Sequence, residues 1–209
     1  MQQSPQLLII ACGAIAREVS AVARINGWKN IKVSQIPAAL HNRPEQIPAA
    51  VEQRLQDYAG EYDHVFVGFA DCGTGGRLDK VIEQYQVQRL SGAHCYEFYA
   101  GSEAFARLAE AELGTFYLTD YLAKHFESLV MQGMGLRDKP KLMPLIFGHY
   151  KKLVYMAQDE TRQLDHFAEA AAKDLGLSYE KIVTGYGQLS SELGQFMHHY
   201  ETKVIKWQH

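Results

Sequence analysis

The fold is decided by the stretch Leu7-Leu8-Ile9-Ile10-Ala11-Cys12-Gly13, a continuous apolar run that ends in a cysteine and a glycine. A short run without polar alternation is typical of a strand that is covered on both faces of a parallel sheet. A second apolar run is Val65-Phe66-Val67-Gly68-Phe69-Ala70, and it is followed by Asp71-Cys72-Gly73-Thr74-Gly75-Gly76. The third cysteine, Cys95, follows His94 in a loop of small residues. We therefore expect three thiols at the carboxyl edge of one sheet, where open α/β folds build their sites.

The rest of the chain alternates between strand and helix patterns, with Asn42 as a candidate helix cap. This alternation predicts an α/β fold with a mostly parallel sheet and helices on both faces, in a Rossmann-like three-layer arrangement. A helical insertion is expected near residues 136–176, and the whole chain, 1–209, is read as a single α/β domain. The expected strands are 7–11, 31–36, 64–70, 87–90, 114–120 and 179–184, and the later expected helices are 98–111, 145–157, 159–175 and 190–199.

Composition restricts the function. The net charge is −3 and basic residues never form a run longer than two, which makes nucleic acid a poor partner. The apolar stretches are too short to cross a membrane, and the start of the sequence lacks the pattern of a secretory signal. We therefore expect a cytoplasmic protein. An odd number of cysteines, three, argues against a disulfide framework, so the thiols are available for other chemistry.

Three thiolates with one open position suit a metal centre at Cys12, Cys72 and Cys95. An iron–sulfur cluster would use all three cysteines, whereas zinc would be completed by His94 or His41. No C-x-x-C pair is present, but ligands drawn from separate strands have no local spacing signature. The alternative is that each cysteine is a small buried hydrophobic residue, as is common in protein cores.

The loops that follow the strands carry further candidates. A glycine-rich segment at a helix start could bind a carboxylate or phosphate, or could simply be a tight turn that needs positive φ angles. Histidines and a glutamate in these loops could act as acids or bases. The candidate catalytic residues are His41, His94 and Glu97, and the candidate ligand-binding residues are Gly13, Arg17, Asn42, Gly73, Thr74, Gly75 and Gly76. Asp120 and Tyr186 are weaker candidates by position alone.

At these segments the chain resembles a bacterial and archaeal family known as domain of unknown function sixteen thirty-eight. The matching motifs are Ala11–Ala14 with Arg17-Glu18, Leu40–Pro44, Asp71–Gly76, His94–Glu97, Gly114–Asp120 and Thr184–Gly187. The family has no assigned activity. Its genes often lie beside corrinoid-dependent methyltransferases, so the resemblance implies a role in methylamine or one-carbon metabolism.

Three functions are compatible with the sequence. The first is a metal-binding protein that acts on or senses a small anionic metabolite. The second is a metal-free enzyme that uses two cysteines as acid and base, as in the two-cysteine amino-acid racemases. The third is a non-catalytic accessory protein for a corrinoid protein or methyltransferase, with the aromatic stretch 147–155 as its contact surface. A homo-oligomer is compatible with each of them.

Overall fold

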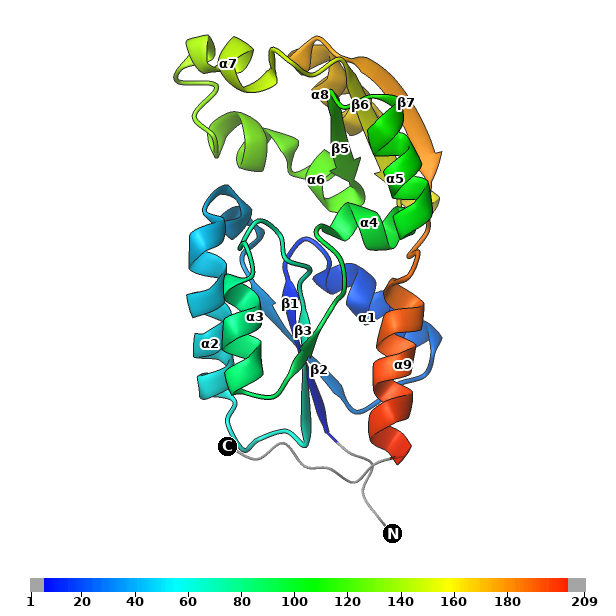
Figure 1. Ribbon diagram of the computed structural model, residues 1–209. Coiled ribbons are helices and arrows are strands. Elements are labelled where there is room, and N and C mark those ends of the chain that lie inside the picture. The colour runs from blue at the N-terminus through cyan, green and yellow to red at the C-terminus, as the bar shows by residue number, and fades with distance from the viewer. Residues whose placement is uncertain (1–5, 203–209) are drawn as a thin grey trace. The chain divides into compact units, whose positions relative to one another are not determined.

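The structure is a computed structural model that describes residues 6–202. The chain forms two compact units: the first contains residues up to Cys95 and from Gln188 onward, and the second contains Tyr96–Gly187. Each unit is an α/β structure with a parallel sheet (Figure 1). The predicted α/β class is therefore confirmed, but the strands form two sheets where the sequence predicted one. That residues 1–209 form a single α/β domain stays a prediction.

The first unit contains a four-stranded sheet in the order β2-β1-β3-β4. The central strand β1 is buried along its whole length, as its unbroken apolar run predicts. In the register, Ala11 of β1 lies opposite Gly68 of β3, and a Cβ atom at Gly68 would lie 3.2 Å from Ala11. The strands are β1 (Leu7–Cys12), β2 (Ile31–Ile36), β3 (His64–Gly68) and β4 (Gln88–Arg89).

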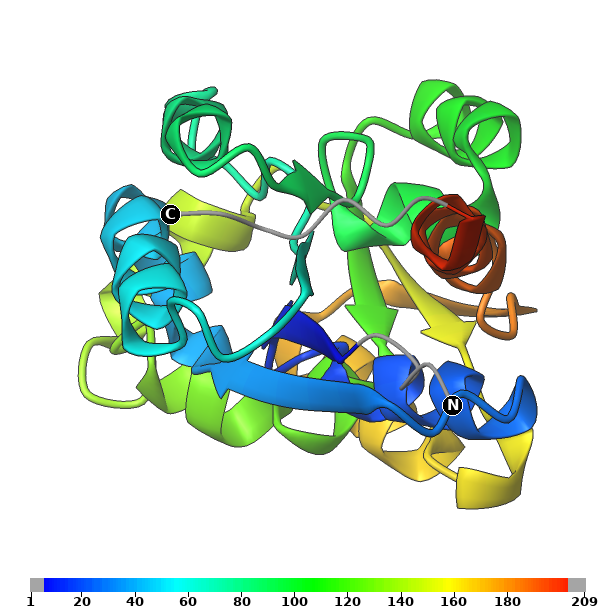
Figure 2. The same ribbon diagram turned by 90° about the horizontal axis from the view of Figure 1, so that it is seen from below.

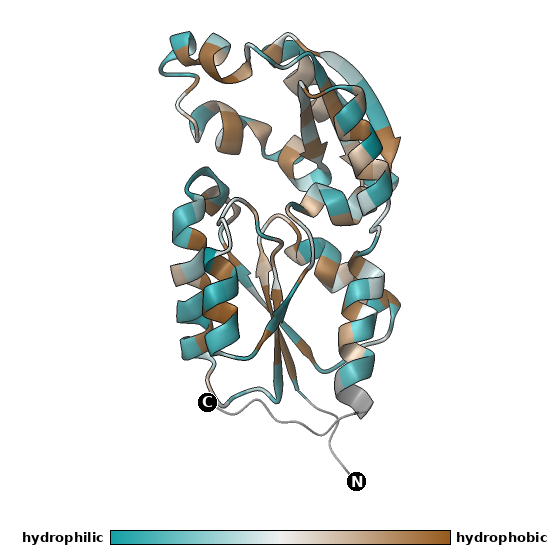
Figure 3. Cartoon of the chain, viewed as in Figure 1, coloured by the Kyte–Doolittle hydropathy of each residue, from teal (hydrophilic) through white to brown (hydrophobic). Residues whose placement is uncertain are grey.

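Helices cover both faces of this first sheet, as a three-layer fold requires. Helices α2 and α3 pack together on one side, and α1 and α9 on the other (Figures 1 and 2). Figure 3 shows the hydrophobic colour concentrated on β1 and β3, between the two layers. The helices are α1 (Ala16–Ile25), α2 (Ile47–Asp57), α3 (Arg77–Gln84) and α9 (Leu189–Thr202), with two 3-10 turns at Ala38–Asn42 and Pro44–Gln46.

The second unit has a three-stranded parallel sheet in the order β5-β6-β7. Its core lies on one face of this sheet, where side chains of β5 and β6 pack against α6, α7 and α8. The elements are α4 (Cys95–Ala100), α5 (Ser102–Ala111), β5 (Thr115–Thr119), α6 (Asp120–Lys124), a π-helical segment (Glu127–Gln132), α7 (Met143–Phe147), β6 (Lys152–Ala157), α8 (Asp165–Leu175) and β7 (Ser178–Val183), with 3-10 turns at Pro140–Leu142 and Glu160–Arg162.

The helix predicted at 145–157 is wrong, and the insertion at 136–176 is therefore not purely helical. Only Met143–Phe147 is helical there, and Lys152–Ala157 forms β6. Residues 153–157 are all buried, because β6 is the central strand of its sheet. A short apolar run of this kind fits a buried helix or a buried strand equally well, so periodicity could not separate them.

Two smaller predictions are also corrected. The helix expected at 98–111 is broken at Gly101, whose φ of +83° separates α4 from α5. Asn42 does not cap a helix: it ends a 3-10 turn, and α2 begins only at Ile47 without a side-chain cap. Within the described residues 6–202, no helix is long and apolar enough to cross a membrane.

Candidate functional site

Four loops meet at the carboxyl edge of the first sheet, one after each strand. The N–H of Gly13 donates to the carbonyl of Ile36 at 2.8 Å, which joins the loops after β1 and β2. The N–H of Cys72 donates to the carbonyl of Ala93 at 2.8 Å, which joins the loops after β3 and β4. This edge is where the sequence placed a site, and it lies entirely within the first unit.

Cys12, the last residue of β1, is buried at this edge of the sheet. The residue is only 3% exposed, and its Sγ atom accepts the N–H of Ala14 at 3.3 Å. Burial raises the pKa of the Cys12 thiol to about 12, because the thiolate loses its hydration, and the hydrogen bond from Ala14 offsets only part of this effect. Cys12 is therefore a neutral thiol at physiological pH.

His41 lies beside Cys12, with its Nδ1 atom 3.8 Å from Sγ. Nδ1 also lies 3.0 Å from the carbonyl oxygen of Ala38. A carbonyl only accepts hydrogen bonds, so Nδ1 carries the proton and Nε2 of the neutral ring is left with its lone pair. The ring stacks over Phe69 at a centroid distance of 6.2 Å. Desolvation lowers the pKa of His41, which keeps the imidazole neutral at pH 7, although the residue remains exposed on its outer side.

Cys72 is the second thiol of the site. Its φ angle is +50°, a left-handed conformation that few non-glycine residues adopt and that often marks functional loops. A negative charge on Cys72 would raise the pKa of the Cys12 thiol, so the two thiols interact electrostatically. Desolvation raises the pKa of the Cys72 thiol to about 11, so both thiols are protonated at neutral pH.

The glycine-rich segment folds around Asp71. The Asp71 carboxylate accepts hydrogen bonds from the N–H of Gly76 at 2.9 Å, the N–H of Gly75 at 3.2 Å and the hydroxyl of Thr74 at 2.7 Å. These bonds lower the pKa of Asp71 to about 2. Gly73, Gly75 and Gly76 all have positive φ angles. The geometry favours the tight-turn interpretation, because the donors proposed for an anion are already used by Asp71, although their ligand-binding role stays a prediction.

Basic side chains surround the edge. Arg17 is exposed on the first turn of α1, and Arg43 is exposed beside Asn42 after β2. Desolvation is the main cause of the lowered pKa of His41, and the charge of His94 contributes to it. In the described part of the chain, Arg43 forms no ion pair. Sequence reasoning gave no role to Arg43 or Phe69. Phe69 has no local signal, since only the fold stacks its ring on that of His41.

The remaining candidate residues, Cys95, Glu97, Asp120 and Tyr186, lie at the start of α4 or in the second unit. Cys95 begins α4, and no disulfide joins the three cysteines. Glu97, Asp120 and Tyr186 belong to the second unit. Within residues 6–202, no three His, Cys, Asp or Glu side chains are arranged to hold a metal ion.

Asp120 is buried in the second unit and is held by its own neighbours. Its carboxylate accepts hydrogen bonds from the Tyr155 hydroxyl at 2.8 Å and from the Gln158 N–H at 3.0 Å, and it pairs with Arg162 at 3.3 Å. The N–H of Asp159 donates to it as well, at 3.1 Å. This network joins β5, β6 and the turn before α8, which is a structural role.

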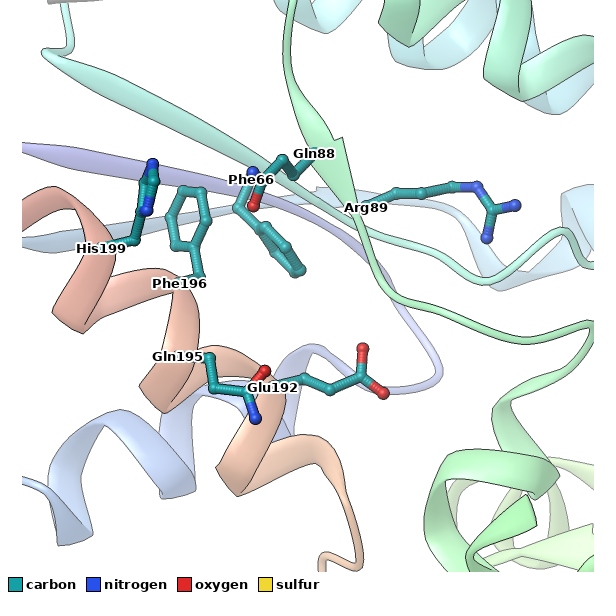
Figure 4. Close-up of a pocket in the computed structure, with 7 residues that line it drawn as sticks. All are labelled: Phe66, Gln88, Arg89, Glu192, Gln195, Phe196 and His199. Carbon is teal, nitrogen blue, oxygen red and sulfur yellow. The ribbon is translucent and has the colours of Figure 1, made fainter. Parts of the chain in front are cut away.

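A hollow of about 310 Å³ lies between β4 and α9, lined partly by Phe66 and Phe196 (Figure 4). Its charged groups are engaged elsewhere in the fold. Arg89 is paired with Asp79 at 2.7 Å, and Glu192 accepts the Ser91 hydroxyl at 2.7 Å. These contacts fasten α3 and α9 to the strand, so we assign this hollow no ligand.

The comparisons with known proteins give one match. A family model described as "Protein of unknown function (DUF1638)" matches residues 35–193, which is more than half of the chain. The chain belongs to this family. The match confirms the resemblance seen in the sequence, but the DUF1638 description assigns no activity, and the link to corrinoid-dependent methyltransferases stays a prediction. No curated protein and no solved structure gives a significant match to this DUF1638 chain.

Proposed function

We propose that the first unit binds a small anionic metabolite at its carboxyl edge and carries out metal-free acid–base chemistry on it. His41 is the base and the thiol of Cys12 or Cys72 is the acid. The observation that carries the proposal is the hydrogen bond from His41 Nδ1 to the Ala38 carbonyl, because it leaves Nε2 as the basic atom of a ring held in one orientation.

The protonation states support these roles. A lowered pKa keeps His41 neutral and able to accept a proton at pH 7. Raised pKa values of about 12 and about 11 keep the thiols of Cys12 and Cys72 protonated and able to donate. In one turnover Nε2 takes a proton from the substrate and a thiol supplies one, after which both groups exchange protons with water.

An anionic substrate fits the charges at this edge. Arg17 and Arg43 stand there with His94, and the Asp71 carboxylate is occupied by its own loop. The N-terminus of α1, at Ala16, lies four residues after Cys12 and adds positive potential to this edge. A carboxylate or phosphate would therefore be attracted to the edge that holds the thiols.

Proton exchange with solvent tests the proposal. The protein is incubated in D₂O with a panel of small 2-amino and 2-hydroxy acids, and loss of the α-proton signal is followed by NMR. We expect exchange with at least one acid, and a rate lower by about 10²–10⁴ in His41→Gln. His166 offers a matched control, since its Nδ1 also lies 3.0 Å from a backbone carbonyl, that of Gln163 in the second unit. Exchange that is absent throughout the panel, or unchanged in His41→Gln, contradicts the proposal.

A metal centre on the same cysteines is the second candidate. The observation that favours it is the N–H of Ala14 directed at Cys12 Sγ, since hydrogen bonds to sulfur also stabilise ligating thiolates. A cluster or zinc on Cys12, Cys72 and Cys95 would need these side chains to move together and to lose their protons. Purification without oxygen, followed by iron, zinc and sulfide analysis, tests it: metal that falls in each single Cys→Ser variant supports this candidate over the first.

A further inference from the structure

A hollow of about 410 Å³ lies at the end of the first sheet opposite the thiols, between the last turn of α1 and the start of β2. It is lined by Ser20, Ala23, Arg24, Gly27, Trp28, Lys29, Ile31 and Val33. We propose that this groove, here called the Trp28 groove, binds an organic anion that has one apolar group and one anionic head. The inference is independent of the proposed acid–base function.

The end of α1 holds Trp28 in place. Gly27 has a φ of +69°, its N–H donates to the Arg24 carbonyl at 3.1 Å, and the N–H of Trp28 donates to the Ala23 carbonyl at 2.9 Å. This pair of bonds is the Schellman motif, in which the residue after the glycine packs back against the last helical turn. The backbone of Trp28 is therefore fixed beside the last turn of α1, and its side chain lines the groove.

Apolar side chains complete the groove. Ile31 and Val33 are two residues apart on β2 and so share one face of the strand. Both are only partly buried, because β2 is an edge strand and α1 ends beside them. Together with Trp28 they present apolar surface that a ligand would remove from water.

The charges of the groove are positive only. Arg24 and Lys29 are both exposed at its rim, and among residues 6–202 no acidic side chain lines it. In the part of the chain that the structure describes, neither of them forms an ion pair. An apolar floor with two unpaired cations is complementary to an amphipathic anion rather than to a neutral or cationic molecule.

Two dyes that share an apolar body test the proposal: anilinonaphthalene sulfonate, which is anionic, and N-phenylnaphthylamine, which is not. The chain has two tryptophans, so Trp207→Phe leaves Trp28 as the only tryptophan, and excitation at wavelengths that tyrosine does not absorb makes it the donor for energy transfer to a bound dye. We expect the sulfonate to bind with energy transfer from Trp28. The affinity of the protein for the sulfonate should fall about five- to tenfold in Arg24→Gln/Lys29→Gln. High salt should lower the affinity of the parent protein for the sulfonate as well.

The neutral dye and a second variant are the controls. Lys32→Gln/Lys80→Gln removes two exposed charges outside the groove and should leave both dyes unaffected. The neutral dye should bind the Arg24→Gln/Lys29→Gln variant as it binds the parent. The proposal is overturned if the sulfonate does not bind near Trp28, if its affinity is unchanged in Arg24→Gln/Lys29→Gln, or if both dyes lose affinity equally. None of these results bears on the exchange reaction at His41.

Discussion

The Sγ atom of Cys12 lies 3.8 Å from the Nδ1 atom of His41, although the two residues are 29 positions apart in the chain. The contact arises because β1 and β2 are parallel neighbours that end together, with Cys12 opposite Ile36. The loop after β2 then returns His41 over the end of β1. A thiol and an imidazole from different loops thereby form the centre of the candidate site.

His41 should titrate below its ordinary pKa of 6.5, because desolvation disfavours the imidazolium ion. The native state then binds fewer protons than the unfolded state, so His41 lowers the free energy of unfolding as the pH falls below 6.5. An NMR titration of the ring, assigned with His41→Gln, measures the pKa and should show the Nδ1–H tautomer. A pKa above 6.5 would refute the electrostatic basis of the site.

The thiols of Cys12 and Cys72 should react slowly in the native protein. Their pKa values of about 12 and about 11 leave little thiolate at pH 8. Alkylation by iodoacetamide should be at least about 100-fold slower than for free cysteine. Mass spectrometry of labelled peptides gives the rates, and unfolding in urea should restore ordinary reactivity. Rapid labelling of either thiol in the folded protein would show that a thiolate is present.

Asp71→Asn should destabilise the first unit by about 1–2 kcal/mol, because an amide cannot accept all the hydrogen bonds of the carboxylate. The pKa of Asp71 is lowered from 3.8 to about 2, so its stabilisation is present above about pH 4 and is lost between pH 4 and 2. Urea unfolding at several pH values should show the difference from the parent shrinking over that range. Asp57→Asn, at the exposed end of α2, is the matched control.

Asp120→Ala should destabilise the second unit by about 3–5 kcal/mol, because it leaves Arg162 and several buried donors without their partner. Thermal unfolding gives the change. Asp165→Asn weakens a partly exposed ion pair with Lys181 and should cost less than about 1 kcal/mol. Equal effects of the two substitutions would show that the Asp120 network does not contribute as its burial implies.

Leu153→Ala should cost about 2–5 kcal/mol, because Leu153 is fully buried in β6. Leu145→Ala, in α7, should cost less than about 0.5 kcal/mol, because Leu145 is 75% exposed. Urea unfolding compares the two. Similar costs would contradict the replacement of the predicted helix 145–157 by a short helix and a strand.

The sequence by itself determined the α/β class, the family and most strands. The run Leu7–Ala11 has no polar face, so the strand it forms is buried on both sides. Gly27 and Gly176 end their helices because glycine readily adopts the positive φ angle of a helix C-terminus. These features depend on residues close together in the chain, which is why the sequence alone was sufficient to predict them.

Only the tertiary structure decided the division into two sheets and the neighbours of each site residue. The run Leu153–Ala157 became a strand because it is the centre of a second sheet, a long-range pairing that local periodicity does not encode. Folding places His41 beside Cys12, and it directs the N–H of Gly76 at the Asp71 carboxylate. Burial and protonation depend on such contacts, so the chemistry of the thiols was decided by packing and not by the motif that carries them.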